Sequence, residues 1–456
     1  MNGPFSLEQL QQALRADLIN ATAVSVTGVS TDSRQLVSGD LFLAIKGPNF
    51  DAHSLVAQAE EKGAVALVVE HQVDSDLPQL IVKDSRLALG DLGAFNRSFF
   101  SGSVFAITGS SGKTTVKEML ASINSQRGQT LATLGNLNNE IGVPLTLLRL
   151  STQDQFAVIE MGASGANEID YSVGLTKPDV ALLNNALAAH LEGFGSLEGV
   201  VHAKAEIFNG LSAEGVGIIN RDDPHYSVWK DILGEQPQLS FGLHPEADVT
   251  ASEIQRQENG CYQFELHFKG QQQTVQLAML GRHNVNNALA SAATALADNC
   301  SLKVISEGLG ACKAVPGRMC PIAADNGLLI DDTYNANPGS MKAAVDALLD
   351  LASDDALSVL ALGDMGELGP DEIEIHADIG RYAAQAGVDV LYTCGPLSAN
   401  TVAAYRSAGG KQSESYQRHE DVVAAIQQLS NNRVTLAKGS RSARMEQVIK
   451  GLQERG

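Results

Sequence analysis

Cysteine is scarce in this sequence and is never closely spaced. The five cysteines are odd in number and form no C-x-x-C pair: Cys261, Cys300, Cys312, Cys320 and Cys394. Disulfide frameworks and zinc knuckles need paired, regularly spaced cysteines. Neither is indicated here, and we expect five reduced thiols.

Positive charge is also in short supply. The chain has 32 Lys and Arg against 53 Asp and Glu, which gives a formal net charge of −21 at pH 7. Such a surface repels a phosphate backbone or an anionic membrane, so we expect no nucleic-acid partner. A small anionic ligand is still compatible, because a few backbone N–H groups and one or two cations build a local positive pocket.

Long apolar runs and targeting signals are missing as well. No stretch approaches the roughly 18 apolar residues that a membrane span needs, and residues 1–15 lack a basic start followed by an apolar run. We therefore expect no membrane insertion and a cytoplasmic location. With 43 Gly and 13 Pro, the chain stays far below the roughly 25–30% content of low-complexity sequences, so a compact fold is expected.

The sequence does provide enough chain for about three domains of roughly 100 to 200 residues each. We predict an α/β fold in three contiguous domains, at residues 1–84, 85–313 and 314–456. The first is a small α/β domain, because apolar runs at 41–45 and 64–69 flank a helix-like stretch at 54–62.

The two later regions alternate apolar runs with helix-length segments, which is typical of mostly parallel sheets wrapped by helices. The central runs lie at 104–108, 156–160, 180–184 and 216–220. Residues 247–280 change to strict alternation around Lys269-Gly270, which predicts an antiparallel hairpin added to the central sheet, before an alanine-rich helix at 284–297. Runs at 328–332, 357–362, 388–393 and 433–437 predict a Rossmann-like C-terminal domain.

The strongest local signal is a glycine-rich turn between a predicted strand and a predicted helix. It consists of Thr108, Gly109, Ser110, Ser111, Gly112, Lys113, Thr114 and Thr115. Glycines let backbone N–H groups converge on phosphate oxygens, Lys113 reaches the β and γ phosphates, and Thr114 can hold Mg²⁺. The turn is shorter than G-x-x-x-x-G-K-[ST], since Ile107 stands where the first glycine belongs. A chance Gly-Lys-Thr turn is the alternative, and the order of strand, turn and helix disfavours it.

A carboxylate ends a predicted neighbouring strand. The run 156–160 finishes at Glu160, and Met161-Gly162 opens a tight loop at the edge of the sheet where ligands collect. A hard cation takes oxygen ligands and keeps waters, so one carboxylate, one hydroxyl and the phosphates suffice for Mg²⁺. An ordinary strand-end glutamate is the alternative for such a residue taken alone.

Two further residues are ambiguous from the pattern alone. His190 follows the run 180–184 just past the same sheet edge, where a single histidine is more often structural than a ligand. Lys204 lies on a predicted helix, and its spacing indicates a solvated helical lysine.

Polar residues near the boundary between the central and C-terminal domains have the chemistry of a nucleotide site. Asn284 and Asn287 share one helix face, and an amide has the donors and acceptor that an adenine edge requires. Capping of the helix by Asn284 is equally compatible. Arg318 can meet a γ-phosphate and Asp332 a ribose hydroxyl, across a cleft between domains.

The order of these motifs resembles the Mur ligase family, ATP-dependent amide-forming enzymes of peptidoglycan synthesis, over the whole chain. The matching positions are 108–115, 160–162, His190, Lys204, 281–284 with Asn287, 316–318 and 332–338. The short phosphate loop is the form that this family uses. The resemblance implies an N-terminal domain that holds a UDP moiety, a central ATPase domain and a C-terminal domain that closes over the nucleotide.

Within the family, several stretches are similar to the member that adds D-alanyl-D-alanine to UDP-N-acetylmuramoyl-tripeptide. These stretches are 31–34, 39–47, 135–144, 362–369 and 438–446, and the Asp-Asn-Pro-Arg signature of the diaminopimelate- or lysine-adding relative is absent. On this resemblance, the substrate-binding residues are Ser33, Arg34, Asn138, Asn139, Asn335 and Arg441, with the last two assigned to the dipeptide.

The resemblance also implies a mechanism and a set of ligands. The γ-phosphoryl group of ATP passes to the tripeptide carboxylate, and the amine of D-alanyl-D-alanine attacks the resulting acyl phosphate. ATP and Mg²⁺ are expected, with Lys113, Glu160, His190 and Lys204 as catalytic residues. Magnesium would be held by Thr114, Glu160, His190 and a carbamoylated Lys204. ATP would be held by residues 108–115, Asn284, Asn287, Arg318 and Asp332. The protein is expected to be a monomer.

Two competing functions stay open from the sequence. Another muramyl-peptide ligase or a folylpolyglutamate synthase would share the ATPase and differ in the acceptor. A nucleotide-dependent switch protein would bind partners without ligation, although the sequence has no Asn-Lys-x-Asp guanine motif and two domains flank the predicted ATPase.

Overall fold

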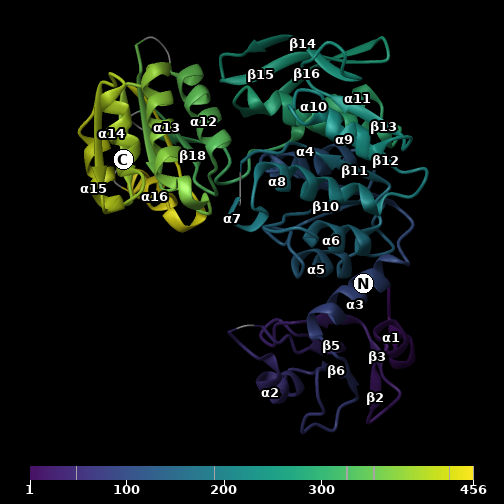
Figure 1. Cartoon of the computed structure of the whole chain (residues 1–456). Coiled ribbons are helices and arrows are strands. Elements are labelled where there is room, and N and C mark those ends of the chain that lie inside the picture. Colours follow the sequence, from purple (N-terminus) through teal and green to yellow (C-terminus); the bar gives the residue numbers. More distant parts are fainter. Residues whose placement is uncertain (48, 189–190, 325–326, 353–354, 431, 455–456) are drawn as a thin grey trace.

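The computed structural model describes residues 1–456 except for 48, 189–190, 325–326, 353–354, 431 and 455–456. It contains three α/β units, each built around its own large sheet, which confirms the predicted three-domain α/β fold. In Figure 1 the N-terminal unit, in purple, lies below the central unit, and the C-terminal unit, in green and yellow, lies beside it.

The N-terminal unit has a sheet whose described strands run in the order β2-β7-β6-β5-β4. Its strands are β1 Phe5–Ser6, β2 Asp17–Ile19, β3 Ser25–Val26, β4 Gly28–Ser30, β5 Asp40–Leu43, β6 Ala66–Val69 and β7 Gln79–Ile81, and its helices are α1 Leu7–Leu14 and α2 Val56–Glu61. Every residue of β5 and β6 is buried. Alternate residues of these strands belong to two different hydrophobic clusters, because successive side chains point to opposite faces of a sheet.

The central unit contains the largest sheet, in which the described strands run in the order β16-β15-β14-β13-β12-β11-β8-β10-β9. Its parallel strands are β8 Ser103–Thr108, β9 Thr130–Ala132, β10 Phe156–Glu160, β11 Val180–Leu183, β12 Val216–Asn220 and β13 Gln238–Phe241. Its helices are α4 Lys113–Ser125, α5 Gly142–Leu148, α6 Glu168–Thr176, α7 Leu191–Phe194, α8 Leu197–Ala205, α9 Tyr226–Leu233, α10 His283–Ala297 and α11 Leu302–Ala311. β8 lies between β10 and β11, so the turn that follows it is at an interior position of the sheet edge.

The alternating segment forms the antiparallel extension that the sequence predicts. β15 Cys261–Phe268 pairs antiparallel with both β14 Val249–Arg256 and β16 Gln271–Leu280, so the extension has one strand more than a hairpin. Lys269 and Gly270 both have positive φ, which is the geometry of a two-residue hairpin turn.

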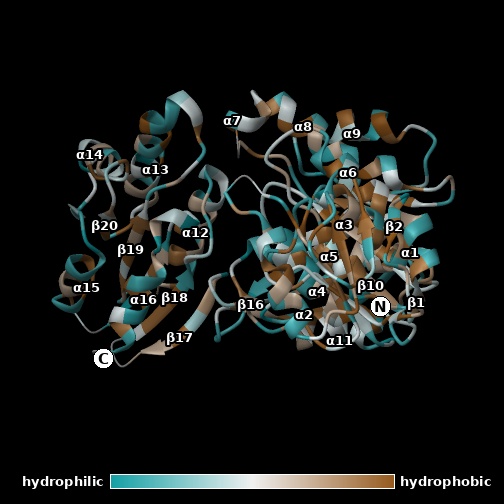
Figure 2. Cartoon of the chain, turned by 90° about the horizontal axis from the view of Figure 1, so that it is seen from below, coloured by the Kyte–Doolittle hydropathy of each residue, from teal (hydrophilic) through white to brown (hydrophobic). Residues whose placement is uncertain are grey.

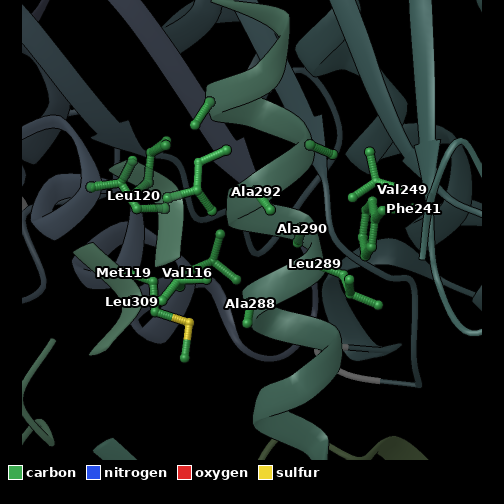
Figure 3. Packing of buried hydrophobic residues seen from close by; sticks show 14 of the residues in the cluster. Val116, Met119, Leu120, Phe241, Val249, Ala288, Leu289, Ala290, Ala292 and Leu309 are labelled. Atoms are coloured by element: carbon green, nitrogen blue, oxygen red, sulfur yellow. The ribbon is translucent and has the colours of Figure 1, made fainter. Parts of the chain in front are cut away.

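The alanine-rich helix α10 packs under this sheet. Small residues such as Ala288, Ala290 and Ala292 are fully buried and let the helix approach both α4 and the strands closely. Figure 3 shows Met119 and Leu120 on one side of α10 and Phe241 on the other.

The C-terminal unit has a six-stranded sheet in the described residues, in the order β17-β18-β22-β19-β20-β21, with only β17 antiparallel. Its strands are β17 Cys320–Ala324, β18 Gly327–Asp332, β19 Leu357–Gly363, β20 Val390–Cys394, β21 Gln412–Tyr416 and β22 Arg433–Lys438, and its helices are α12 Pro338–Leu351, α13 Glu372–Ala386, α14 Ala399–Ser407, α15 His419–Gln427 and α16 Glu446–Gln453. This arrangement confirms the predicted doubly wound fold.

Helices and polar contacts join the units. α3, Ser85–Arg97, packs against α1 of the N-terminal unit and against α5 and α6 of the central unit. The Tyr262 hydroxyl donates to the Asp350 carboxylate, and Arg256 donates to the Asp350 carbonyl, so β14 and β15 contact α12. Figure 2 shows hydrophobic segments, in brown, gathered in the interior strands and hydrophilic segments, in teal, in the outer loops. In the described part of the chain, no helix is long and apolar enough to cross a membrane.

Candidate active site

The turn after β8 has the geometry of a phosphate-binding loop. Gly112, at the N-terminus of α4, has φ 79°. A Cβ atom there would lie 2.5 Å from Asn287 Oδ1 and 2.7 Å from Asn184 Nδ2, so only glycine fits. The Asn185 carbonyl and side-chain oxygens accept from the backbone N–H groups of Ser110 and Ser111 at 3.0 and 2.9 Å. The loop is therefore held rigidly at the N-terminus of a helix, where anions bind.

Lys113 lies over this loop. Its Nζ donates to the Gly109 carbonyl at 2.6 Å. Burial lowers the pKa of the Lys113 ammonium, the charge of Glu160 opposes that shift, and the charge of Arg318 adds to it. Lys113 thus lies within electrostatic range of both the carboxylate and the arginine that the sequence predicts for the same site.

Glu160 ends β10 at the same edge and is 1% exposed. Its Oε1 accepts from Asn138 Nδ2 at 2.7 Å and from the Thr114 hydroxyl at 3.3 Å. Its Oε2 is buried, and no described residue hydrogen-bonds to it. A buried carboxylate oxygen without a partner costs free energy, so this oxygen is oriented to bind something that the chain itself does not supply.

Lys204 is buried rather than solvated, so the expectation from its spacing is wrong. The side chain on α8 is 2% exposed, and Nζ lies 3.4 Å from the Ala163 carbonyl and over the Phe194 ring. The pKa of Lys204 falls to about 7, mainly through burial and then through the charge of Lys113. Helical spacing did not reveal this burial, because the apolar cover comes from other elements. His190, the other ambiguous residue, lies outside the described residues.

The two amides on α10 contact the loop but do not cap the helix. Asn284 Nδ2 donates to the Leu280 carbonyl at 2.7 Å, and Asn287 Nδ2 donates to Asn284 Oδ1 at 2.8 Å. The residue at the cap position is Arg282, which makes no side-chain cap hydrogen bond. Capping by Asn284 is therefore wrong, because the residue lies inside the helix and its Oδ1, the atom that would cap, accepts from Asn287.

Arg318 and Asp332 come from the linker and from β18. Arg318 donates to the Thr114 hydroxyl at 3.4 Å and stacks on the Tyr334 ring. Both Asp332 oxygens are engaged, Oδ2 by the Lys438 ammonium at 2.7 Å and Oδ1 by the Met319 backbone N–H at 3.2 Å. The C-terminal unit therefore contributes a fixed ion pair to the site.

These side chains surround a cavity of about 270 Å³ between the central and C-terminal units. The residues that line it and that the sequence predicts are Ser110, Ser111, Gly112, Lys113, Thr114, Thr115, Asn284, Asn287, Arg318, Asp332 and Asn335. Thr108 and Glu160 lie directly behind this lining: Thr108 is fully buried and donates to the Met161 carbonyl at 2.8 Å.

A second cavity, of about 660 Å³, shares Ser110 and Lys113 with the first. Arg441 and Arg444 contribute to its wall. Arg441 pairs with Glu446 at 3.3 Å, whereas the described residues offer Arg444 no ion pair. This cavity extends from the phosphate loop to two cations of the C-terminal unit.

A third cavity, of about 590 Å³, lies in the N-terminal unit and contains Ser33, Arg34 and Phe50. The Ser33 hydroxyl donates to Gln58 Oε1 at 2.7 Å, and Arg34 pairs with Asp32 at 2.8 Å. Asn139, predicted with them, instead accepts from the Gly142 backbone N–H at 2.9 Å at the start of α5. Ser33 and Arg34 therefore belong to a separate cavity, and Asn138 belongs to the carboxylate site.

Several site residues were not singled out from the sequence. Asn184 and Asn185 hold the phosphate loop, Lys438 pairs with Asp332, and His283 lines the first cavity with a buried, unpartnered Nδ1. The position of Asn184 and Asn185 at the end of a buried strand was the available signal. Lys438 opens the 438–446 stretch that carries the family resemblance, but its role was not predicted, because its partner Asp332 is distant in sequence.

The fold and the site together define a class. A phosphate loop at an interior position of a parallel sheet edge, with a buried carboxylate beside it and a flanking domain on each side, defines a multidomain protein with a nucleoside-triphosphate site. The described residues contain no group of three or more His, Cys, Asp and Glu side chains that could hold a metal on its own.

Comparisons with known proteins identify the family to which the chain belongs. Three family models match: the Mur ligase family catalytic domain at residues 25–94, the Mur ligase middle domain at 107–295, and the Mur ligase glutamate ligase domain at 317–441. The UDP-N-acetylmuramoyl-tripeptide–D-alanyl-D-alanine ligase of Escherichia coli K12 is 45% identical over 99% of both chains. The chain belongs to the Mur ligase family, so it is an ATP-dependent ligase.

Solved structures agree with this assignment. A crystal structure of MurF from Acinetobacter baumannii superposes with a TM-score of 0.92 at 38% identity, covering 99% of both chains. The MurF ligase of Thermotoga maritima, solved in complex with ADP, gives a TM-score of 0.84 at 28% identity, covering 94% of this chain and 99% of that one.

Proposed function

We propose that the protein joins D-alanyl-D-alanine to UDP-N-acetylmuramoyl-tripeptide with conversion of ATP to ADP and phosphate through an acyl phosphate, in cytoplasmic peptidoglycan precursor synthesis. The observation that carries this proposal is that Ser110 and Lys113 of the phosphate loop line the same cavity as Arg441 and Arg444. An acceptor bound to the arginines would thereby face the phosphate loop. The relatives that are similar over the full length are named as UDP-N-acetylmuramoyl-tripeptide–D-alanyl-D-alanine ligases. This similarity favours D-alanyl-D-alanine as the acceptor over the acceptors of sister ligases.

ATP would occupy the cavity between the central and C-terminal units. The first N–H groups of α4, which have no partner within the helix, and Lys113 would bind the β and γ phosphates. Arg318 would neutralise charge as the γ-phosphoryl group leaves. His283, with its buried Nδ1 free of described partners, and the Asn284–Asn287 pair line the same cavity and are the candidates for binding the base. Asp332, held by Lys438, is the candidate for the ribose.

The residues present fit a magnesium ion. The unpartnered Glu160 Oε2 and the Thr114 hydroxyl are hard oxygen ligands beside the phosphate loop, which is the donor set that Mg²⁺ takes together with phosphates and waters. Mg²⁺ bound there supplies positive charge next to the phosphates. Asn138, which donates to Oε1, would keep the second oxygen directed at the ion.

Lys204 would act as a carbamate. A lysine whose pKa is about 7 is substantially neutral at physiological pH, and the neutral amine is the form that attacks CO₂. The new N–C bond releases one proton and turns a cation into a carboxylate-like group. Such a group would add an oxygen ligand for a second magnesium ion, with Glu160 and His190.

The acceptor and the nucleotide sugar would bind in two separate cavities. Arg441, Arg444 and Asn335 line the second cavity and suit the dipeptide carboxylate, because arginine binds carboxylates in a bidentate manner. Ser33, Arg34 and the exposed Phe50 line the N-terminal cavity, which suits the UDP end. Asn139, already bonded to Gly142, would support the loop that carries Asn138.

Three smaller proposals go with this function. The domain boundaries at 84/85 and 313/314 fall between β7 and α3 and between α11 and β17. The net charge of −21 favours neither nucleic acid nor an anionic membrane as a partner. We propose a monomer, because Glu160, Thr114 and Arg318 already meet within a single chain.

Phosphate release tests the proposed function. We expect steady release only when ATP, Mg²⁺, UDP-N-acetylmuramoyl-tripeptide and D-alanyl-D-alanine are all present, with L-alanyl-L-alanine as the matched control acceptor. Equal release without an acceptor would instead indicate a nucleotide switch, and turnover with a single amino acid or with glutamate would indicate a sister ligase.

A further inference from the structure

A second lysine of α4 is buried without any role in the function proposed above. Lys117 lies one helical turn after Lys113, and it is 2% exposed. Its Nζ donates to the Thr133 carbonyl at 2.8 Å and lies 2.5 Å from Glu118 Oε1. Lysines are almost never this buried unless they are paired, because removing the ammonium from water is costly.

The contact made by Lys117 leads directly to Glu160. Thr133 follows β9, and its hydroxyl accepts from the Glu160 backbone N–H at 3.0 Å. The same loop continues to Asn138, whose amide donates to Glu160 Oε1 at 2.7 Å and whose carbonyl accepts from the Gly162 N–H at 2.7 Å. Residues 133–138 therefore hold Glu160 at both its backbone and its carboxylate.

Thr133 is held on two sides: its N–H donates to the Val158 carbonyl of β10 at 3.0 Å, and its carbonyl accepts from Lys117 of α4. β9 is a three-residue strand at the edge of the sheet and pairs only with β10 among the described strands. Without Lys117, the buried Thr133 carbonyl would lose its side-chain donor, which costs about 1–3 kcal/mol for a buried acceptor. The donor comes from α4, the helix that also carries Lys113 and Thr114.

We propose that Lys117 is a positioning residue for Glu160: it fixes the 133–138 loop to α4, so that one helix sets the place of the phosphate loop and of the carboxylate together. The inference rests on the proposed role of Glu160 toward magnesium. Lys117 itself touches neither substrate nor ion and acts through Thr133 and Asn138.

Calorimetric titration of ATP into the full chain at a series of Mg²⁺ concentrations tests this proposal. In Lys117→Met, the Mg²⁺ concentration that gives half-maximal enhancement of ATP binding should rise about tenfold, as for other residues that orient a metal ligand. ATP affinity in EDTA should stay within about twofold, because the phosphate loop is untouched.

Ser122→Ala is the matched control. Ser122 lies on the same helix and donates to the Gly308 carbonyl at 2.7 Å, away from Glu160. Its loss removes a comparable hydrogen bond, so it should lower thermal stability without moving the Mg²⁺ requirement. A Mg²⁺ shift in Ser122→Ala equal to that of Lys117→Met would overturn the proposal, since general loosening of α4 would then explain both.

Two further arms keep the result decisive. Lys117→Gln retains a donor of shorter reach without a charge, and it should raise the Mg²⁺ requirement at least threefold; an unchanged requirement in either folded Lys117 variant refutes the positioning role. The effects of Lys117→Met and Asn138→Ala should be less than additive, because both act through one loop. If the unaltered chain shows no Mg²⁺ enhancement at all, the magnesium assignment itself fails, and the Lys117 role fails with it.

Discussion

The edge of the central sheet and the N-terminal cavity are built in opposite ways. At the central edge, Glu160 is 1% and Lys204 2% exposed, and their contacts come from residues distant in sequence. In the N-terminal cavity, the Arg34 side chain is 81% exposed and bonds to Asp32 only two positions away. Phe50, beside it, is 58% exposed.

Their electrostatics differ for the same reason. Burial is the main cause that lowers the pKa of Lys204 to about 7, so this shift reports a water-poor environment. The pKa of Asp32 falls to about 2 because of hydrogen bonds from Arg34, in a carboxylate whose side chain is still 29% exposed. A large pKa shift therefore marks a rigid chemical site at the first place and only a local pair at the second.

The comparison separates chemistry from recognition. Phosphoryl transfer depends on groups fixed in advance, because reorganising them during the reaction would cost the stabilisation they provide. Binding of a large substrate can order exposed side chains on contact. We therefore expect changes at the central edge to reduce kcat and changes at the N-terminal cavity to raise KM.

Lys113→Ala should give the largest effect. Loss of the ammonium over the phosphate loop should reduce ADP formation about 10³-fold or more while the far-UV circular dichroism stays unchanged. Lys303→Ala, which removes an exposed lysine of α11, serves as the control and should keep full activity. Normal turnover by a folded Lys113→Ala protein would refute the role of Lys113 in the phosphate loop. It would also refute the distinction between a chemical site at the central edge and a recognition site in the N-terminal cavity.

Lys204→Ala should come next, with a loss of about 10²-fold that short-chain carboxylic acids partly restore by supplying the missing carboxylate. Since the pKa of Lys204 is about 7, the neutral amine is scarce at pH 6 and predominant at pH 8. Reactivation of carbamate-depleted enzyme at a fixed dissolved CO₂ concentration should therefore be faster at pH 8. Lys230→Ala, an exposed lysine of α9, is the control; failure of every acid to rescue would count against the carbamate.

Arg34→Ala should have the smallest effect. Because the side chain is exposed and its pair with Asp32 is local, we expect KM for UDP-N-acetylmuramoyl-tripeptide to rise about three- to tenfold with kcat unchanged. Arg86→Ala breaks a similar exposed pair with Asp84, outside the cavity, and should change neither constant. A fall in kcat that approaches the effect of Lys113→Ala would show that the two regions are not distinct.

Local pattern by itself determined most of the central framework. The runs predicted at 156–160 and 216–220 coincide with β10 and β12, because buried parallel strands are continuous apolar runs. The turn before α4 lies at the predicted position, because glycine marks the phosphate turn. β17 and β21 escaped prediction: the first contains Pro321 and the second is largely polar, and both lie at sheet edges where one side faces solvent.

Tertiary structure alone decided which of the polar residues meet. Lys204 has a helical spacing like that of any solvated lysine, yet packing against Phe194 and Ala163 buries it. Lys438 pairs with the Asp332 carboxylate, and Lys117 donates to the Thr133 carbonyl, only because the order of strands brings distant segments to one edge of the sheet. Sequence periodicity fixes which side of its own element a residue occupies, whereas the partner across that side depends on the fold of the whole chain.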